Sequence, residues 1–583
     1  MTVEESIILS NGEAAAAEVT QTTERTPAES LLPHNTQSAS SSNTQTVIQV
    51  DALVVGAGFS GITAIHRLRE AGLTVKCMEA SGDFGGVWNF NRYPGAGVDV
   101  EVPFYQLNIP EVYRDWTFSE RFPGHEELRS YVAHIDKKLG LQRDTIFHAT
   151  VNDASWDLHK GRWTVRTEQG HTASAKYLIL ASGLLHRIYT PDFPGLSNFS
   201  GDIHHSAAWN QNFSAKGKKI GLIGAGSTGV QLTQSLGKAA AELTVLVRRP
   251  GYCLPMKQRT LTPQEQHEWK RLYPLMLKAA RESHVGFPVP ATTKAALDVS
   301  KEEREQHWAY TWEQGGFSFG MQAFKDASRN KESNELMYQY WRSRVASRLT
   351  DPRKLEVMAP EQKPYYFITK RLPLEQDYYE VLNQDNVHVH DLSKIPLKSF
   401  TSNGLLMADG TEYEFDAVVL ATGFDSITGS LTQLGVKDKH GVDLKTLWAD
   451  GVKTYMGITI SGFPNMFVVY SPQAPTPFVN AVTILEAQVE LAVDIIKKME
   501  EKGYKSIEAT KEAESQWKKD LYAMTEGTLF PFTDSWWNNA NVPGKKAEIL
   551  AYVAGIKHYE AKCRSLVEGL QGFEVDFGRE DGT

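Results

Sequence analysis

The chain has 583 residues but only three cysteines, no excess of basic residues and no long apolar run. Cys77, Cys253 and Cys563 are scattered and form no C-x-x-C pair, which excludes a disulfide framework, a redox dithiol and a thiolate zinc site. We predict no metal site. The net charge of −9 and a pI near 6.1 argue against nucleic-acid binding, because that function requires a basic face.

Residues 1–48 differ in composition from the rest of the chain. They are rich in Ser, Thr, Ala, Glu and Gln and contain few large apolar residues, which predicts a disordered N-terminal tail. The tail lacks the basic and apolar regions of a secretory signal, and its glutamates argue against a mitochondrial presequence. No apolar run reaches the roughly 20 residues of a membrane span, so we expect no membrane contact and a reducing, cytoplasmic location.

Two glycine-rich turns of the same form, G-x-G-x-x-G, stand far apart in the sequence. The first follows the apolar run 52–55 and the second follows the run 220–223. Between a strand and a helix, such a turn lets the backbone approach a pyrophosphate, which also meets the positive end of the helix. We therefore predict an α/β fold with two Rossmann-like dinucleotide-binding domains. The expected contacts are Gly56, Gly58, Phe59, Ser60 and Gly61 in the first turn, and Gly224, Gly226, Ser227, Thr228 and Gly229 in the second.

The strands that follow the two turns end in opposite charges. The strand predicted over 73–78 ends at Glu79, whose carboxylate can accept hydrogen bonds from a ribose diol. The strand predicted over 243–247 ends at Arg248 and Arg249, and a guanidinium at that place suits a 2′-phosphate. The sequence therefore predicts FAD at the first turn and NADPH at the second, which indicates a redox enzyme.

Composition and pattern divide the rest of the chain. We predict a first segment of the FAD-binding domain over 49–190 and an NADPH-binding domain over 191–385. Residues 262–349 look helical and aromatic, with a capping box at 300–303, and are interpreted as a helical insertion or as ordinary connecting helices. Residues 386–583 are assigned to the second FAD segment and the C-terminal region, with the run 420–425 marking a return to the FAD domain.

Two further motifs resemble those of a known family. The stretch 199–209 fits the fingerprint F-x-G-x-x-x-H-x-x-x-W of type I Baeyer–Villiger monooxygenases through Phe199, Gly201, His205 and Trp209. The second motif is Gly85-Gly86-Val87-Trp88 followed by Tyr93-Pro94-Gly95 and Asp99. The resemblance extends from residue 50 to about 555 and is closest to phenylacetone and cyclohexanone monooxygenase-like flavoproteins. The chain departs from the family at Asn210, Arg249 and Ser471.

The resemblance implies an NADPH-dependent flavin monooxygenase that inserts one atom of O₂ next to a ketone carbonyl through a C4a-peroxyflavin, giving an ester or a lactone. It implies that Arg371 and its partner Asp99 are catalytic, that Lys370 and Arg248 bind the 2′-phosphate with Arg249 as support, and that His205 couples the domains or is structural. Other cofactor contacts implied are Ala80, Gly86, Val87, Trp88, Tyr105, Gln231 and Trp536, and the implied substrate pocket contains Thr476, Pro477 and Phe478.

Three other functions deserve comparison. A flavin-containing monooxygenase that oxidises amine nitrogen or sulfur has Tyr or Phe in place of Trp209, and would not be expected to have Arg371. A pyridine nucleotide–disulfide reductase needs a cysteine pair that the sequence lacks. A catalytically inactive nucleotide-binding scaffold would not need Arg371, Asp99 and Lys370. We expect a monomer acting on a ketone, with a sulfide as a side substrate, while aryl, cyclic, long-chain and natural-product ketones all remain open.

Overall fold

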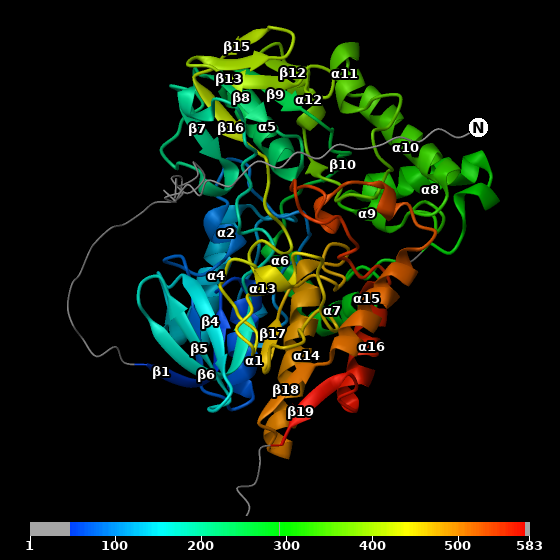
Figure 1. Cartoon of the computed structure of the whole chain (residues 1–583). Helices are drawn as coiled ribbons and strands as arrows, with labels where there is room; N and C mark the ends of the chain where they lie inside the picture. The colour runs from blue at the N-terminus through cyan, green and yellow to red at the C-terminus, as the bar shows by residue number, and fades with distance from the viewer. Residues whose placement is uncertain (1–46, 291, 578–583) are drawn as a thin grey trace, which may run out of the picture. The chain divides into compact units, whose positions relative to one another are not determined.

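Two large sheets, one mixed and one parallel, organise the described part of the chain, residues 47–290 and 292–577 of a computed structural model (Figure 1). The predicted tail, 1–48, lies outside those residues except at its end, where the first strand begins. Both sheets have a strand, a glycine turn and a helix at their centre. The predicted α/β class with two Rossmann-like domains agrees with this arrangement.

The first sheet carries the first glycine turn. Its parallel part runs in the order β3-β2-β1-β6, and β17 joins the C-terminal half of β6. An antiparallel hairpin of β4 and β5 joins the N-terminal half of β6. The strands are β1 (Ile48–Val55), β2 (Val75–Met78), β3 (Thr145–Ile146), β4 (Val151–Asp157), β5 (Arg162–Thr167), β6 (Thr172–Leu180) and β17 (Met466–Val468).

The second sheet carries the second glycine turn and is parallel throughout, in the order β12-β9-β8-β16-β7. Its strands are β7 (Asp202–His205), β8 (Lys219–Ile223), β9 (Glu242–Val247), β12 (Val387–Asp391) and β16 (Ala417–Leu420). The predicted boundary at residue 386 is therefore wrong, because β12 and β16 pair with β9 and β8. The chain returns to the first sheet only at β17, after the run 420–425.

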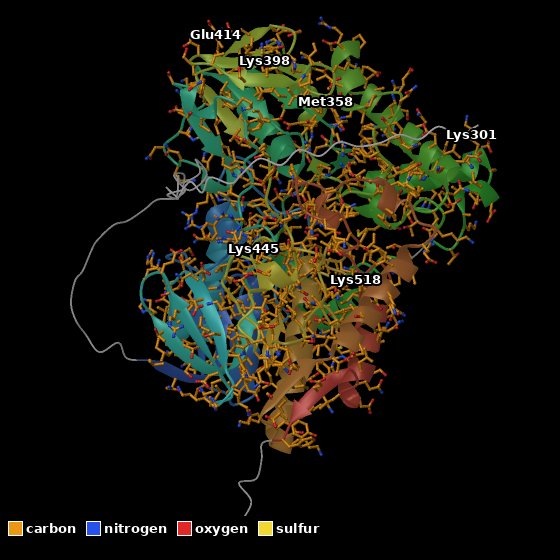
Figure 2. The ribbon with its side chains drawn as sticks, viewed as in Figure 1. Lys301, Met358, Lys398, Glu414, Lys445 and Lys518 are labelled. Atoms are coloured by element: carbon orange, nitrogen blue, oxygen red, sulfur yellow. The ribbon has the colours of Figure 1, made fainter. Side chains whose placement is uncertain are left out.

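Smaller sheets complete the strand content of the described residues. They are β10 (Leu254–Pro255) with β11 (Leu374–Glu375), β13 (Leu397–Phe400) with β14 (Gly404–Met407) and β15 (Glu412–Glu414), and β18 (Ser506–Ala509) with β19 (Phe573–Asp576). In Figure 2 the exposed residues Lys398 and Glu414 mark β13 and β15 beside the second sheet. Side chains of β10 and β11 join the core of the second sheet, and those of β18 join the core of the first.

Long amphipathic helices cover the first sheet. The buried face of α14 (Ala481–Lys502) packs against α1 (Phe59–Glu70), which begins at the first glycine turn. The helix α4 (His125–Leu139) buries Leu128, Tyr131 and Ile135 in the same core. The remaining elements near this core are α2 (Val87–Phe90), α3 (Pro110–Tyr113), α13 (Leu444–Leu447), α15 (Lys511–Thr525) and α16 (Gly555–Glu568).

The predicted helical segment 262–349 contains α6 (Pro263–Lys270), α7 (Tyr273–Arg281), α8 (Lys301–Gln314), α9 (Ser318–Met321) and α10 (Lys331–Ala346). The N-cap half of the predicted capping box is present, since the Ser300 hydroxyl accepts a hydrogen bond from the Glu303 amide. Side chains of α8 and α10 join the core of the second sheet, whereas those of α6 and α7 pack on the first. The second sheet also packs against α5 (Ser227–Ala239), α11 (Pro352–Met358) and α12 (Tyr378–Leu382).

Within the described residues, no helix combines the length and apolar character needed to cross a membrane.

Candidate active site

The leading glycine of each turn is required by the backbone. Gly56 has φ +100°, and a Cβ atom there would lie 2.6 Å from the Ala181 carbonyl oxygen. Gly224 has φ +118°, and its Cβ would lie 2.5 Å from the Ala421 carbonyl oxygen. The two turns therefore use one geometry, in which the turn passes close to the strand that returns beside it.

No contact within the described part of the protein excludes a side chain at Gly226, the middle glycine of the second turn. A Cβ at Gly226 would meet no atom within 4 Å, so the space beside it is open. Neither α1 nor α5 has a side-chain cap on its first amides, and neither has an acidic residue in its first turn. Free amides at a helix N-terminus with room for close approach fit a dinucleotide pyrophosphate.

Glu79 is buried at the end of β2. Its carboxylate accepts hydrogen bonds from the amides of Ala57, at 2.6 Å, and Ser81, at 2.8 Å. Ala57 lies inside the first glycine turn, so Glu79 is tied to the expected dinucleotide site by a direct bond. Ala80, beside it, is exposed.

At the end of β9, three cations gather instead. Arg248 and Arg249 are exposed, and the Lys370 ammonium lies 4.3 Å from the centre of the Tyr365 ring. Burial, together with the nearby charges of Arg249 and Arg248, lowers the pKa of Lys370 to about 8. Arg249 also reaches Asp534 at 3.2 Å. Such an excess of positive charge suits an anionic ligand such as a phosphate.

The predicted G-G-V-W motif packs against the glycine turn of the first sheet. Gly86 has φ +52°, and a Cβ there would lie 2.9 Å from Gly58 Cα, so the two glycines pack backbone to backbone. Val87 begins the short helix α2, and the Trp88 indole N–H donates to the Tyr105 hydroxyl at 2.9 Å. The motif thus closes over the first turn.

Arg371 and Asp99 form a two-bond ion pair, as predicted. Arg371 Nε donates to Asp99 Oδ2 at 2.9 Å, and Nη2 donates to Oδ1 at 2.6 Å. The guanidinium lies 4.5 Å from the centre of the Phe317 ring, and both charged side chains keep about a quarter of their surface exposed. Asp99 raises the pKa of Arg371 against the opposing effect of burial. The pair therefore holds a fixed cation that solvent can still reach.

Three tyrosines surround this pair and stay neutral. Burial raises the pKa of Tyr93 and of Tyr470 to about 12, and raises the pKa of Tyr105 further. Asp99 adds to the shift of each. The charge around the pair at neutral pH is consequently that of Arg371 and Asp99.

Gln231 was expected to lie under a pyrophosphate, but the protein itself uses its side-chain amide. The Tyr93 hydroxyl donates to Gln231 Oε1 at 2.7 Å, and Gln231 Nε2 donates to the Gly97 carbonyl at 2.9 Å. Gln231 lies on α5 beside the second sheet, whereas Tyr93 and Gly97 belong to the segment that carries Asp99. The residue therefore bridges the two halves of the chain.

The fingerprint residues lie on and beside the second sheet. His205 ends β7 directly beside Leu420 of β16, and its Nδ1 accepts from the Ala207 amide at 3.1 Å. Burial lowers the pKa of His205 to about 4, so the ring is neutral at pH 7. A Cβ at Gly201 would collide with the Phe199 ring at 2.6 Å, and Trp209 packs on His204. These contacts are structural in kind.

An apolar cavity lies where the C-terminal region meets the segment before Arg371. It is lined by Phe478, Phe530 and Trp537 together with Thr369, and the Phe478 and Trp537 rings are 4.5 Å apart. Of the predicted pocket residues, Phe478 lines this cavity, whereas Pro477 is buried and the Thr476 hydroxyl donates back to the Ser471 carbonyl at 2.8 Å. Trp536 packs on the core of the first sheet.

Comparison with known proteins identifies the family. A family model described as flavin-binding monooxygenase-like matches residues 50–280. The FAD-binding monooxygenase acrE of Aspergillus aculeatus is 42% identical over 91% of this chain and 89% of its own length. A Baeyer–Villiger monooxygenase of Pseudooceanicola batsensis is 35% identical over 90% of this chain and 96% of its own. The chain belongs to the Baeyer–Villiger monooxygenases.

A solved structure of the family supports the same conclusion at the level of fold. Cyclohexanone monooxygenase from Rhodococcus sp. Phi1 bound to NADP⁺ has a TM-score of 0.88 and 34% identity, covering 91% of this chain and 100% of that one. The predicted fold class and the predicted enzyme class, a flavin monooxygenase that uses FAD and NADPH, are confirmed for this Baeyer–Villiger monooxygenase.

Sequence reasoning missed four aromatic residues of this monooxygenase. Phe317 lies against Arg371, Tyr365 lies against Lys370, Tyr470 lies near the ion pair, and Trp537 lines the cavity with Phe478. Tyr365, Tyr470 and Trp537 each stand close in the sequence to a predicted site residue, namely Lys370, Thr476 and Trp536, and this proximity was a usable signal. Phe317 is brought to Arg371 by a contact between distant segments.

Proposed function

We propose that this Baeyer–Villiger monooxygenase uses NADPH and O₂ to insert one oxygen atom next to the carbonyl of a ketone, giving an ester or a lactone. The observation that carries the proposal is the ion pair of Arg371 and Asp99. Bound FAD, once reduced by NADPH, supplies the oxygen-activating chemistry. The test is NADPH oxidation with a ketone panel and mass spectrometry of the products. If no ketone gains an oxygen atom, the proposal fails.

In this proposal, Arg371 provides the fixed charge that the reaction needs. Oxygen insertion passes through a tetrahedral species with a negatively charged oxygen, and a preorganised donor stabilises such a charge. A guanidinium cannot become neutral by losing its proton under these conditions. Asp99 orients it through two hydrogen bonds, and Phe317 supports its face.

The cofactor residues divide between the two turns. We assign the first turn and Glu79 to FAD, with the turn amides facing the pyrophosphate and the carboxylate facing the ribose. The second turn, Arg248 and Lys370 bind NADPH, and Arg249 is shared between the 2′-phosphate and Asp534. The family resemblance adds Ala80, Gly86, Val87, Trp88, Tyr105, Thr228, Gln231 and Trp536 to the proposed cofactor contacts.

The cavity beside Phe478 is proposed as the apolar end of the substrate site. Its aromatic lining favours an apolar group, and its volume of about 20 Å³ admits only a small one beside Phe478. Phe478→Ala should leave NADPH oxidation without substrate unchanged and shift preference toward bulkier ketones by roughly 10–200-fold. An unchanged substrate profile would remove Phe478 from the site.

Amine or sulfur oxidation as the main activity has less support, because the relatives reported above include ketone monooxygenases. Sulfide oxidation is proposed as a side activity of the same site. We also propose that the protein is a monomer, which sedimentation analysis can test. The cytoplasmic location stays a prediction.

A further inference from the structure

The segment 99–109 carries two residues of the Arg371 site but has no helix or strand of its own. Asp99, at its start, pairs with Arg371, and Tyr105, in its middle, accepts the Trp88 indole N–H. Since a segment without regular structure has few backbone bonds to fix it, its position must come from contacts made by other elements.

Three side chains from outside hold the backbone of this segment: Glu486 lies on α14, Asn480 is the residue that caps α14, and Tyr131 lies on α4. The contacts are Asn480 Nδ2 to the Phe104 carbonyl at 2.7 Å, the Leu107 amide to the Tyr131 hydroxyl at 3.0 Å, and the Asn108 amide to Glu486 Oε1 at 2.6 Å. The contact to Glu486 is the shortest of the three and has an acidic acceptor.

Glu486 is buried and lacks a cation of its own. Burial is the main cause that raises its pKa to about 7. Glu490 on the same helix adds to this rise, whereas the Asn108 amide, Arg281 of α7 and Arg67 of α1 oppose it. Each arginine is bonded to other carboxylates. The proposed reaction gives Glu486 no chemical part.

We propose that Glu486 is a positioning residue, whose carboxylate holds the Asn108 end of the segment 99–109 and so keeps Asp99 and Tyr105 placed against Arg371. Hydrogen bonds to an ionised acceptor are roughly twice as strong as neutral ones, so loss of the charge loosens the segment. Only the catalytic test of this inference rests on the proposed function.

The control is Glu514 on α15, one turn before Lys518, which Figure 2 labels. It is also a buried carboxyl whose pKa burial raises, and it accepts one loop amide, that of Ser461, at 2.7 Å. The loop at Ser461 carries no residue of the site. Glu486→Leu and Glu514→Leu therefore remove the same kind of bond from different places.

The experiment measures ester or lactone formed per NADPH oxidised, from pH 6 to 9, in the FAD-loaded variants. Glu486→Leu should lower this ratio by about tenfold, the effect of one hydrogen bond to a charged group, while FAD content stays unchanged. Glu486→Gln keeps an acceptor for Asn108 and should lie between. It should also lack the fall of the ratio below pH 7 that protonation of Glu486 should cause in the wild type. Glu514→Leu should keep the wild-type ratio and pH profile.

A second readout does not need a ketone. Hydrogen exchange of residues 99–109 should accelerate at least about fivefold in Glu486→Leu and stay at the wild-type rate in Glu514→Leu. Equal hydrogen exchange of residues 99–109 in Glu486→Leu and Glu514→Leu overturns the inference. If Glu486→Leu does not fold, the exchange of the same residues is compared in Glu486→Gln instead. A wild-type protein that oxygenates no ketone refutes the proposed function, while the exchange result still tests Glu486.

Discussion

At the first glycine turn, Glu79 is buried and already bonded to two backbone amides, whereas at the second turn Arg248 and Arg249 are exposed and both crowd Lys370. The turns themselves have nearly the same backbone, as the φ angles of Gly56 and Gly224 show. The difference between the two sites thus lies in how each charge is held before a ligand arrives.

That difference matches two ways of using a cofactor. The first site is organised by the protein itself, which favours a cofactor that stays bound. The second site carries repelling positive charges that a phosphate would neutralise, so ligand binding relieves a cost present in the free protein. An exchangeable coenzyme with an additional phosphate fits the second site.

The largest effect is expected where the two halves meet, at Arg371. Arg371→Ala removes the fixed cation and should lower ketone oxygenation by at least about 10²-fold, while FAD and NADPH binding persist. Product formation and FAD absorbance measure the two properties. Normal ester formation by this variant would show that the meeting point of the two halves is not the reactive centre. Asp99→Ala should cost less, because its proposed role is to orient Arg371.

The next effect separates the second site from the first. Arg248→Ala or Lys370→Ala removes one charge-assisted phosphate contact and should raise KM for NADPH about tenfold to a few hundredfold. KM for NADH, which lacks the 2′-phosphate, serves as the internal control and should change little. A wild type that uses NADH and NADPH equally well would contradict the assignment of the second site.

The sequence predicted what short stretches determine and failed where distant stretches meet. The glycine turns and the charges after β2 and β9 were predictable, because each belongs to one strand–turn–helix unit. The boundary at 386 was wrong because β12 finds its partner β9 some 140 residues earlier, counted from Val387 to Leu243 as 387 − 243 = 144. Phe317 was missed because only the folded insertion brings it against Arg371.

A third prediction compares two glycines within the second turn. A Cβ at Gly229 would lie 2.1 Å from the Gly224 carbonyl oxygen, so Gly229→Ala should lower the free energy of unfolding by about 1–3 kcal/mol. A Cβ at Gly226 meets only open space, so Gly226→Ala should change stability by less than about 0.5 kcal/mol and raise KM for NADPH. Thermal unfolding and NADPH kinetics measure both. Equal destabilisation would mean that the space beside Gly226 is not a ligand cradle.

The smallest effect is a pH dependence that only the second site should show. The free protein holds the pKa of Lys370 near 8, below its ordinary value, so the lysine loses its proton as pH rises from 7 to 9. KM for NADPH should then rise about threefold to tenfold, while KM for NADH stays flat, and Lys370→Met should remove the rise. The stability of the free protein should increase over the same range, although NADPH binding weakens. The unfolded chain holds this proton up to a higher pH than the folded protein does, so unfolding becomes less favourable as pH rises above 8. Bound NADPH should weaken that trend by returning the proton to Lys370. A KM for NADPH that does not vary between pH 7 and 9 in the wild type would show that Lys370 does not contact the phosphate, and the contrast between the two turns would then rest on Arg248 alone.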